Sequence, residues 1–166
     1  VGTVARPASL SATLLKKSNL SFQHDDLTRE KVVLFFVVSS TVGLINALHI
    51  PDFHRNWVEQ GLLKPQDFNF NLLQYPYPQR IDLLPESYKE KVKEKYEKHL
   101  EWLRPLDSLT RATKGFESGL DYMLRRDNSK DLQQFKDTMK KLDVIRDENL
   151  LEVFPELTEL YETHKA

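Results

Sequence analysis

Lys31-Val-Val-Leu-Phe-Phe-Val-Val-Ser-Ser40 is the stretch that decides the fold. It is rich in β-branched and aromatic residues and is continuously apolar from Val32 to Val38, which is typical of a strand buried on both faces of a parallel sheet. A second strand is predicted over Phe68–Leu73. It ends before Tyr75-Pro-Tyr-Pro78, because proline cannot donate a hydrogen bond to a neighbouring strand.

The segment between these strands, residues 48–61, predicts a helix. Pro51 suits its first turn, and Gly61 suits the left-handed residue that follows a last turn. Its inner side is expected to carry Phe53, Trp57 and Val58. A strand, a helix and a strand in this order normally form a right-handed unit with parallel strands.

The chain after residue 84 is predicted to be helical almost throughout, beginning with a helix over 85–103. Five apolar residues recur there at spacings of four and three and should face the core: Tyr88, Val92, Tyr96, Leu100 and Leu103. Its outer side should carry the ion pairs Glu86–Lys89, Glu90–Lys93 and Glu94–Lys98. Each such pair contributes only ~0.2–0.5 kcal/mol, so this charged side is best explained as a solvated face.

Three further helices are expected in the C-terminal half. In the first, over 106–126, Gly115 and Gly119 lie four residues apart, so a neighbouring backbone could approach closely. The second should be capped by Asn128 or Ser129. Its inner stripe is predicted to be Leu132, Phe135, Met139, Leu142 and Ile145. Pro155 is expected to open the last helix, over 156–163.

The overall composition predicts one soluble domain. The 166 residues fit a single α/β domain over 25–166, preceded by an acid-free basic arm over 1–24. That arm resembles an organellar transit segment, with a plain polar arm as the alternative, so we expect a cytoplasmic or organellar-matrix protein. The net charge of −1 argues against a general nucleic-acid binder. No apolar run approaches the ~20 residues that a membrane span needs.

The chain has no cysteine, which limits its chemistry. Cysteine nucleophiles, zinc–thiolate sites and cysteine-held iron–sulfur clusters are all excluded within this chain. We therefore expect no cofactor bound through cysteine.

Polar side chains near the two strands are the main candidates for ligand binding. The first group, expected just beyond the first strand, is Ser39, Ser40, Thr41 and Asn46. Open parallel sheets bind ligands just beyond the carboxyl ends of their strands. Asn69 and Asn71 alternate with apolar residues of the second strand, so one face of that strand is polar. This pattern indicates either a ligand cavity or barrel interior, or an edge strand with one wet face.

His49, Asp52 and His54 are the only dense cluster of metal-ligand types. Two imidazoles and a carboxylate can form a metal site with open positions. However, Pro51 should begin the helix after His49, and residues two apart on a helix point to different sides. We therefore expect Asp52 to cap the helix and both histidines to be partly exposed.

Three stretches resemble, in this order, the C-terminal half of twitch-domain-containing radical S-adenosylmethionine proteins. They are Val37-Val-Ser-Ser-Thr-Val-Gly-Leu-Ile-Asn46 with Leu48-His-Ile-Pro-Asp-Phe-His-Arg-Asn-Trp57, then Phe70-Asn-Leu-Leu-Gln-Tyr-Pro76 with Leu83-Leu-Pro85, and finally Leu142-Asp-Val-Ile-Arg-Asp-Glu-Asn149 with Phe154-Pro-Glu-Leu157.

The resemblance implies a partial (β/α) barrel in which the segments 31–40 and 68–73 are late strands. Ser39, Ser40 and Asn71 would then face the S-adenosylmethionine side. In that family an early three-cysteine motif holds a [4Fe–4S] cluster, and the usual targets are peptides or proteins. This chain lacks that half and any cysteine, so it cannot perform radical chemistry alone.

Two functional hypotheses follow. The first is a cysteine-free relative that is non-catalytic alone and binds a partner chain, a peptide or a nucleotide-like ligand, with S-adenosylmethionine bound only if another chain supplies the missing half. Its partner, or a second copy, would cover the open sheet edge. The alternative is a structural accessory subunit of a larger multiprotein assembly, such as an organellar one. An enzyme using the histidine cluster ranks last, because no set of nucleophile, base and orienting group is visible.

Overall fold

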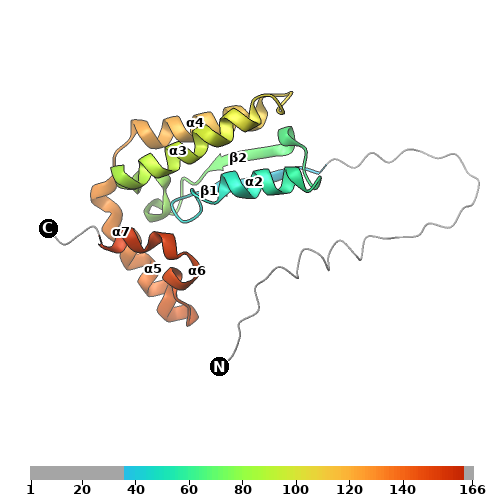
Figure 1. Ribbon diagram of the computed structural model, residues 1–166. Helices are drawn as coiled ribbons and strands as arrows, with labels where there is room; N and C mark the ends of the chain where they lie inside the picture. Colours follow the sequence, from blue (N-terminus) through green and yellow to red (C-terminus); the bar gives the residue numbers. More distant parts are fainter. Residues whose placement is uncertain (1–35, 163–166) are drawn as a thin grey trace, which may run out of the picture. The chain divides into compact units, whose positions relative to one another are not determined.

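The computed structural model describes residues 36–162, which form a short parallel strand pair followed by a mostly helical part (Figure 1). Strand β1 (Val38–Val42) pairs in parallel with β2 (Phe68–Leu72), in a register that sets Val38 opposite Phe68. The strand pair and the helical remainder are as predicted. The arm expected over 1–24 and the first residues of the strand expected over 31–40 lie outside the described range.

The remaining elements follow in chain order. The helices are α2 (Ile50–Glu59), α3 (Glu86–Leu103), α4 (Arg111–Arg125), α5 (Leu132–Arg146), α6 (Leu150–Val153) and α7 (Thr158–Glu162). Short 3-10 turns occupy Pro65–Asp67, Tyr77–Gln79, Ile81–Leu83, Ser129–Asp131 and Pro155–Leu157. Within residues 36–162 the sheet has two strands, so the expected partial barrel is not seen.

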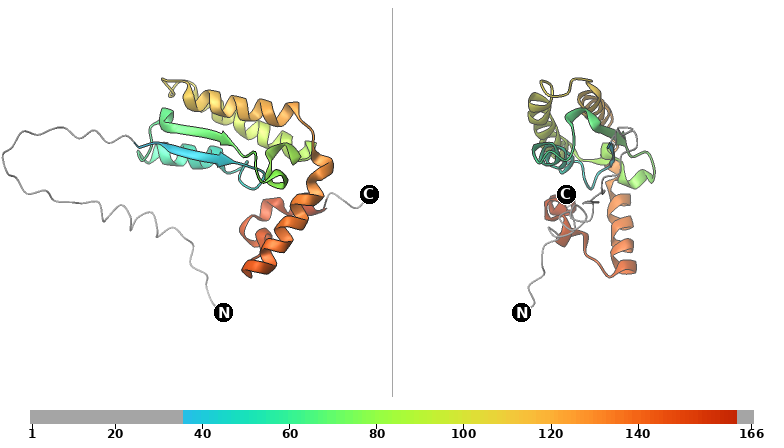
Figure 2. Two further views of the ribbon diagram at one scale, coloured as in Figure 1. Left: turned by 180° about the vertical axis from the view of Figure 1, so that it is seen from behind. Right: turned by 90° about the vertical axis from the view of Figure 1, so that its right-hand side faces the viewer.

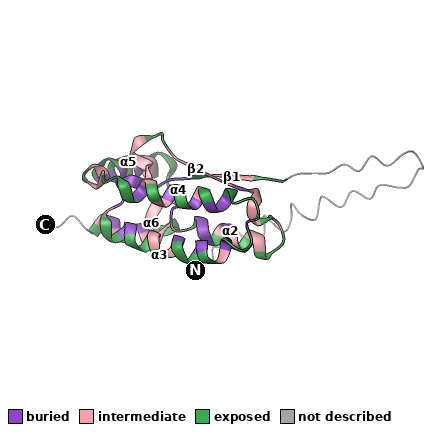
Figure 3. Ribbon diagram, turned by 90° about the horizontal axis from the view of Figure 1, so that it is seen from above, coloured by how far each residue is buried: buried purple, intermediate pink, exposed green. Residues whose placement is uncertain are grey.

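The strand pair is covered on one face. Helices α2, α3 and α4 lie to one side of β1 and β2 (Figures 2 and 3). Burial alternates along β1 accordingly: Val42 is fully buried, whereas Ser39 and Thr41 are exposed. The prediction that this strand is buried on both faces is therefore wrong for the described residues.

Helix α2 has the predicted ends but a different inner residue. Pro51 lies in its first turn, and Gly61 after its last turn has a φ of 69°. Phe53, Trp57 and Val58 are only partly buried, although they pack against the core. The fully buried side chain on this helix is His54.

Helix α4 begins at Arg111 rather than near 106. The backbone N–H of Thr113 in its first turn donates to Asp107 Oδ2 at 2.8 Å, so Asp107 satisfies one of the free amides at the helix start. The predicted close approach at the two glycines is present. A methyl group on Gly115 would lie 2.7 Å from Phe70 Cβ, and one on Gly119 would lie 2.5 Å from the Phe70 ring. It is mainly this side chain of β2, rather than a backbone, that uses the space.

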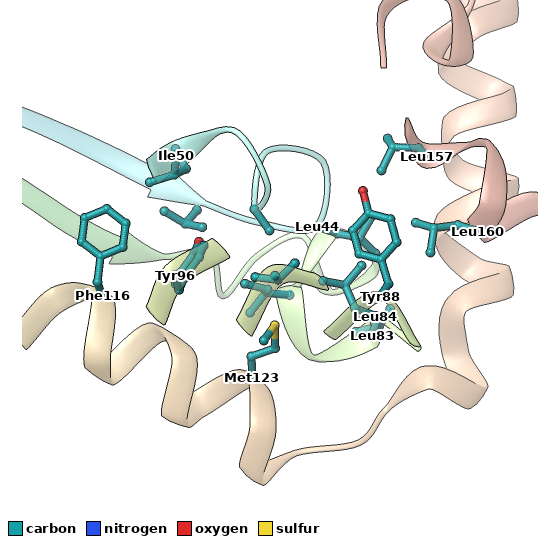
Figure 4. Close-up of a cluster of buried hydrophobic side chains, with 14 of the residues drawn as sticks. Leu44, Ile50, Leu83, Leu84, Tyr88, Tyr96, Phe116, Met123, Leu157 and Leu160 are labelled. Atoms are coloured by element: carbon teal, nitrogen blue, oxygen red, sulfur yellow. The ribbon is translucent and has the colours of Figure 1, made fainter. Parts of the chain in front are cut away.

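The core runs along α3. All five residues of its predicted stripe are buried: Tyr88, Val92, Tyr96, Leu100 and Leu103. Figure 4 shows Tyr88 beside Leu157 and Leu160, which come from the end of the described chain. The same core therefore connects the sheet, the long helices and the C-terminal helices.

Of the three ion pairs predicted on α3, two are confirmed and one is wrong. The ion pairs Glu90–Lys93 and Glu94–Lys98 are present. Lys89, in contrast, is buried, and its Nζ donates to the Arg126 carbonyl at 2.7 Å instead of pairing with Glu86. Such burial is tolerated because the lysine finds a carbonyl from the distant α4–α5 connection.

The start and the end of α5 also differ from the sequence prediction. Neither Asn128 nor Ser129 caps the helix with its side chain. The Asn128 amide instead donates to Asp82 Oδ2 at 2.8 Å. Leu132, Phe135 and Met139 of the predicted stripe are buried and Leu142 is half-buried, but Ile145 is 78% exposed.

Candidate functional site

A polar patch covers the open face of the strand pair. Ser39 is in register with Asn69, and Thr41 with Asn71. Because side chains alternate along a strand, these four share one face. Asn69 Nδ2 donates to Ser39 Oγ at 3.2 Å across the strands. The predicted residues therefore form an open polar surface, which corresponds to the wet-face alternative.

Ser40 and Asn46 do not join this polar patch. Ser40 is in register with Phe70 and points to the opposite, helix-covered face. Asn46 lies in the turn after β1, where its Nδ2 donates to the Thr41 carbonyl at 2.9 Å and its Oδ1 accepts from the Gly43 N–H at 2.9 Å. The strand also continues to Val42, so the three hydroxyl residues lie within it rather than beyond it.

Within residues 36–162, backbone groups at the outer edge of β1 have no hydrogen-bond partner. Leu73 N–H donates to the Val42 carbonyl at 2.9 Å, so the peptide groups of Val42 face β2. Those of alternate residues, Ser39 and Thr41, therefore face away from β2. The Asn46 amide occupies the Thr41 carbonyl, which leaves the Thr41 N–H and both backbone groups of Ser39 at an exposed edge.

The three candidate metal ligands point to three different partners. His49 pairs with Glu156, Asp52 with Lys95, and His54 with His99. Over residues 36–162 no group of three such side chains is placed to hold a metal ion. The predicted capping role of Asp52 is wrong, because no side chain caps α2 and the Asp52 carboxylate binds a lysine of α3.

His54 and His99 form a buried pair that the sequence did not predict. His54 Nδ1 lies 3.0 Å from His99 Nε2, and His54 Nε2 lies 3.2 Å from the Pro65 carbonyl oxygen. A carbonyl can only accept, so His54 Nε2 carries a proton and its Nδ1 accepts from His99 Nε2. This arrangement needs the His54 ring to be neutral, because its Nδ1 has to accept.

The surroundings keep this pair uncharged. The His54 ring stacks on Phe68 and Phe116, with centroids 4.5 and 5.7 Å away. Burial lowers the pKa of His54 to about 4, although the Pro65 carbonyl and Asp107 oppose the shift. Burial, and then the positive charge of a protonated His54, lower the pKa of His99 to about 3.

No catalytic set is assembled around the histidine pair. In the described part of the chain, neither imidazole hydrogen-bonds to a serine or threonine hydroxyl. The two rings instead contact each other, a backbone carbonyl and aromatic side chains. The pair therefore acts as a polar part of the core that links α2 to α3.

A second buried polar group holds the connection between α4 and α5. Asp82 is fully buried, and its Oδ1 accepts from Arg80 Nε at 3.0 Å. Its Oδ2 accepts from Asn128, and Arg80 also donates to the Tyr122 hydroxyl at 2.6 Å. Hydrogen bonding to Asp82 raises the pKa of Arg80, so the guanidinium group stays charged. These contacts join segments 42 to 46 residues apart, which no local sequence pattern reveals.

The end of α5 carries the most exposed apolar side chains among the described aliphatic residues. Val144 and Ile145 are each 78% exposed, and Val153 of α6 is 66% exposed. The two α5 residues line a shallow hollow of about 580 Å³ with Asp137, Lys140 and Lys141. This α5 patch (Val144, Ile145, Lys140 and Lys141) was missed, because helical spacing had placed Ile145 inside.

The described residues form three surfaces that can make contacts with a ligand or a partner. The polar patch and the β1 edge offer hydrogen bonds, and the α5 patch offers apolar contact beside two lysines. None of the helices in the range 36–162 is long and apolar enough to cross a membrane.

Comparison with known proteins adds no further assignment, and the resemblance to radical S-adenosylmethionine proteins stays a prediction. No protein-family model matches this chain, and neither the curated proteins nor the solved structures contain a significant match to it.

Proposed function

We propose that this chain is a non-catalytic binding subunit and that a partner polypeptide adds a strand to the outer edge of β1. The observation that carries the proposal is the two-stranded parallel sheet with one exposed face and outward-facing peptide groups at Ser39 and Thr41.

Parallel sheets rarely occur in this form. They are normally covered on both faces and contain several strands, because an exposed parallel pair leaves backbone groups and side chains in water. An added strand would take the free Ser39 and Thr41 groups into hydrogen bonds. Phe36 and Val37, exposed just before β1, would give the same strand apolar contacts. Both effects favour an extended partner segment at this edge.

A strand at this position would also extend the pair towards the partial (β/α) barrel that the family resemblance implies. If the partner carried the three-cysteine motif, the cluster and S-adenosylmethionine would belong to the partner. The polar patch, with Ser39 and Asn71, would then lie where a nucleotide-like ligand or a peptide binds. On this proposal the present chain completes the sheet and contributes binding surface, not the reacting group.

The test begins with native mass spectrometry of the chain isolated from its source, with companion chains identified by intact mass. The companion is then produced separately and titrated against the Ser39→Pro and Ser39→Ala variants. Proline removes the outward N–H that an added strand needs, whereas alanine keeps it. We expect proline to weaken binding at least tenfold and alanine to leave it within twofold.

Hydrogen exchange provides a second readout if Ser39→Pro perturbs the fold. Binding of the companion to the unmodified chain should slow exchange of the Ser39 and Thr41 amides. Equal affinity of the two variants, or unchanged exchange at both amides, would show that the partner does not use the β1 edge.

The α5 patch favours a second candidate, a structural accessory subunit of a larger assembly. Val144 and Ile145 form an apolar pair beside Lys140 and Lys141, and no ion pair within the described residues engages either lysine. Such a surface fits an acidic partner with apolar side chains. A companion complex that survives Ser39→Pro but is lost on Ile145→Lys would favour this candidate.

A further inference from the structure

Lys136 is a buried lysine where α5, α6 and α7 meet. It lies on the inner stripe of α5 with Leu132 and Met139 and is 7% exposed. Its Nζ lies 5.6 Å from the centre of the Tyr161 ring of α7. An aromatic ring is therefore the observed neighbour of this amine.

Among the described residues, no carboxylate forms an ion pair with the Lys136 amine. Asp137 accepts from the Gln133 amide at 2.9 Å, and Asp143 accepts from the Leu150 N–H at 3.2 Å. Over residues 36–162 no carboxylate lies within ion-pair distance of Lys136 Nζ. Lys89, the other buried lysine, has a carbonyl and a carboxylate as partners.

A buried ammonium group without a carboxylate gives up its proton more readily than an exposed one. Burial lowers the pKa of the Lys136 amine, and no opposing charge restores it. A neutral amine has a free electron pair and is a nucleophile, which an ammonium group is not.

The amine also lines a hollow of suitable size. The hollow measures about 290 Å³, close to the lower end of small-molecule sites. Its lining residues include Lys136, Asp137, Lys140, Asp143, Asn149 and Tyr161, and neither carboxylate forms an ion pair with Lys136. Lys136 thus combines burial, a missing counter-charge and a space that a small molecule can enter.

We propose that Lys136 is an amine nucleophile that binds a small aldehyde or ketone in this hollow as an imine. The Nζ electron pair attacks the carbonyl carbon, and a C=N bond replaces the C=O bond. The two amine protons leave with the carbonyl oxygen as water, so the step needs no oxidant or reductant. This site is independent of the β1 edge and of any partner there.

The Tyr161 side chain supports this chemistry. Burial, followed by the charge of Asp143, raises the pKa of the Tyr161 phenol, so it stays protonated at neutral pH. A neutral ring over the amine limits access by water and does not compete for the carbonyl carbon.

The test is reductive trapping on the full chain. Propanal and sodium cyanoborohydride are added at pH 7, so that hydride converts any imine into a stable secondary amine, and each lysine is followed by peptide mass spectrometry. We expect Lys136 to be modified at least tenfold faster than Lys140, which lines the same hollow but is exposed. Modification of Lys140 as fast as, or faster than, Lys136 would overturn the proposal.

Two controls separate reactivity from simple accessibility. In concentrated urea, Lys136 and Lys140 should react within twofold of each other, because unfolding removes the special environment. In the folded chain the buried Lys89 should remain unmodified, because its amine is hydrogen-bonded. In Lys136→Arg the fast site should disappear without a new one; if that variant does not fold, the site-resolved rates of the unmodified chain still decide.

Discussion

Acid should unfold this protein through the His54–His99 pair well before its carboxylates titrate. Both rings are buried and neutral in the folded chain, with pKa values lowered to about 4 and about 3. In the unfolded chain each returns to about 6.5. The unfolded state therefore binds protons first as the pH falls, so stability is complete above about pH 7.5 and decreases below it.

The size of this loss follows from the two shifts. Relative to pH 8, each histidine removes about 0.8 kcal/mol at pH 6 and about 2 kcal/mol at pH 5. Together the pair should lower the free energy of unfolding by about 2 kcal/mol at pH 6 and about 4 kcal/mol at pH 5. The loss should level off below pH 3, where the folded pair also becomes protonated.

Urea unfolding followed by circular dichroism at pH 8, 6 and 5 measures this dependence. The double variant His54→Leu with His99→Leu should have a nearly flat profile over this range, whatever its stability at pH 8. His49→Gln is the matched control, because His49 is an exposed histidine outside the buried pair, and the decrease in stability between pH 8 and pH 6 should persist in this variant. A drop below about 0.5 kcal/mol between pH 8 and pH 6, or the same drop in the double variant, would refute the reasoning.

Three further predictions concern packing, the buried ion pair and the α5 patch. Gly119→Ala should lower the free energy of unfolding by about 1–3 kcal/mol, because the added methyl group meets the Phe70 ring, and Gly119→Ala combined with Phe70→Leu, which removes those ring atoms, should recover part of this loss in the same urea assay. Asp82→Asn should lower the free energy of unfolding by about 3–5 kcal/mol, since Arg80 then keeps a mostly buried charge without a counter-ion. Adding Arg80→Met removes that charge and should restore stability. If the double variant instead loses the sum of the two single losses, the ion-pair account is contradicted. Ile145→Lys should change stability by less than about 0.5 kcal/mol, because the side chain is exposed, and a larger loss by thermal unfolding would show that Ile145 packs inside.

The elements that could be predicted are those with a local apolar period. The apolar residues from Tyr88 to Leu103 correctly predicted α3 and its buried side, because residues three and four positions apart lie on the same face of a helix. Gly115 and Gly119 pointed to a close approach, which Phe70 makes. In each case the information lies within a few turns of one helix.

The misses have a common physical cause. His54, Lys89 and Asp82 are buried because each finds a partner at least 37 residues away along the chain, and no periodicity records such a pairing. Ile145 continues the apolar spacing of α5, but the helix ends one residue later, so its last turn has nothing to pack against.

The candidate site was predicted by residue type but not by geometry. Alternation correctly placed Asn69 and Asn71 on one strand face. The same alternation in the first strand separates Ser40 from Ser39 and Thr41, which the sequence prediction had grouped together. The sequence prediction ended the first strand at Ser40, whereas the strand continues to Val42 with the same alternating pattern.

Asn46 has a consequence for how this chain avoids aggregation. Its side-chain amide already donates to the Thr41 carbonyl, so a strand that lands on β1 meets a weakened acceptor at that residue. The edge can therefore accept a short segment, but it gives no continuous template for fibre-like stacking of copies. Asn46 thus protects the edge of β1 against pairing between copies. The variant Asn46→Ala should therefore aggregate more, measured as increased light scattering of a concentrated solution at constant temperature.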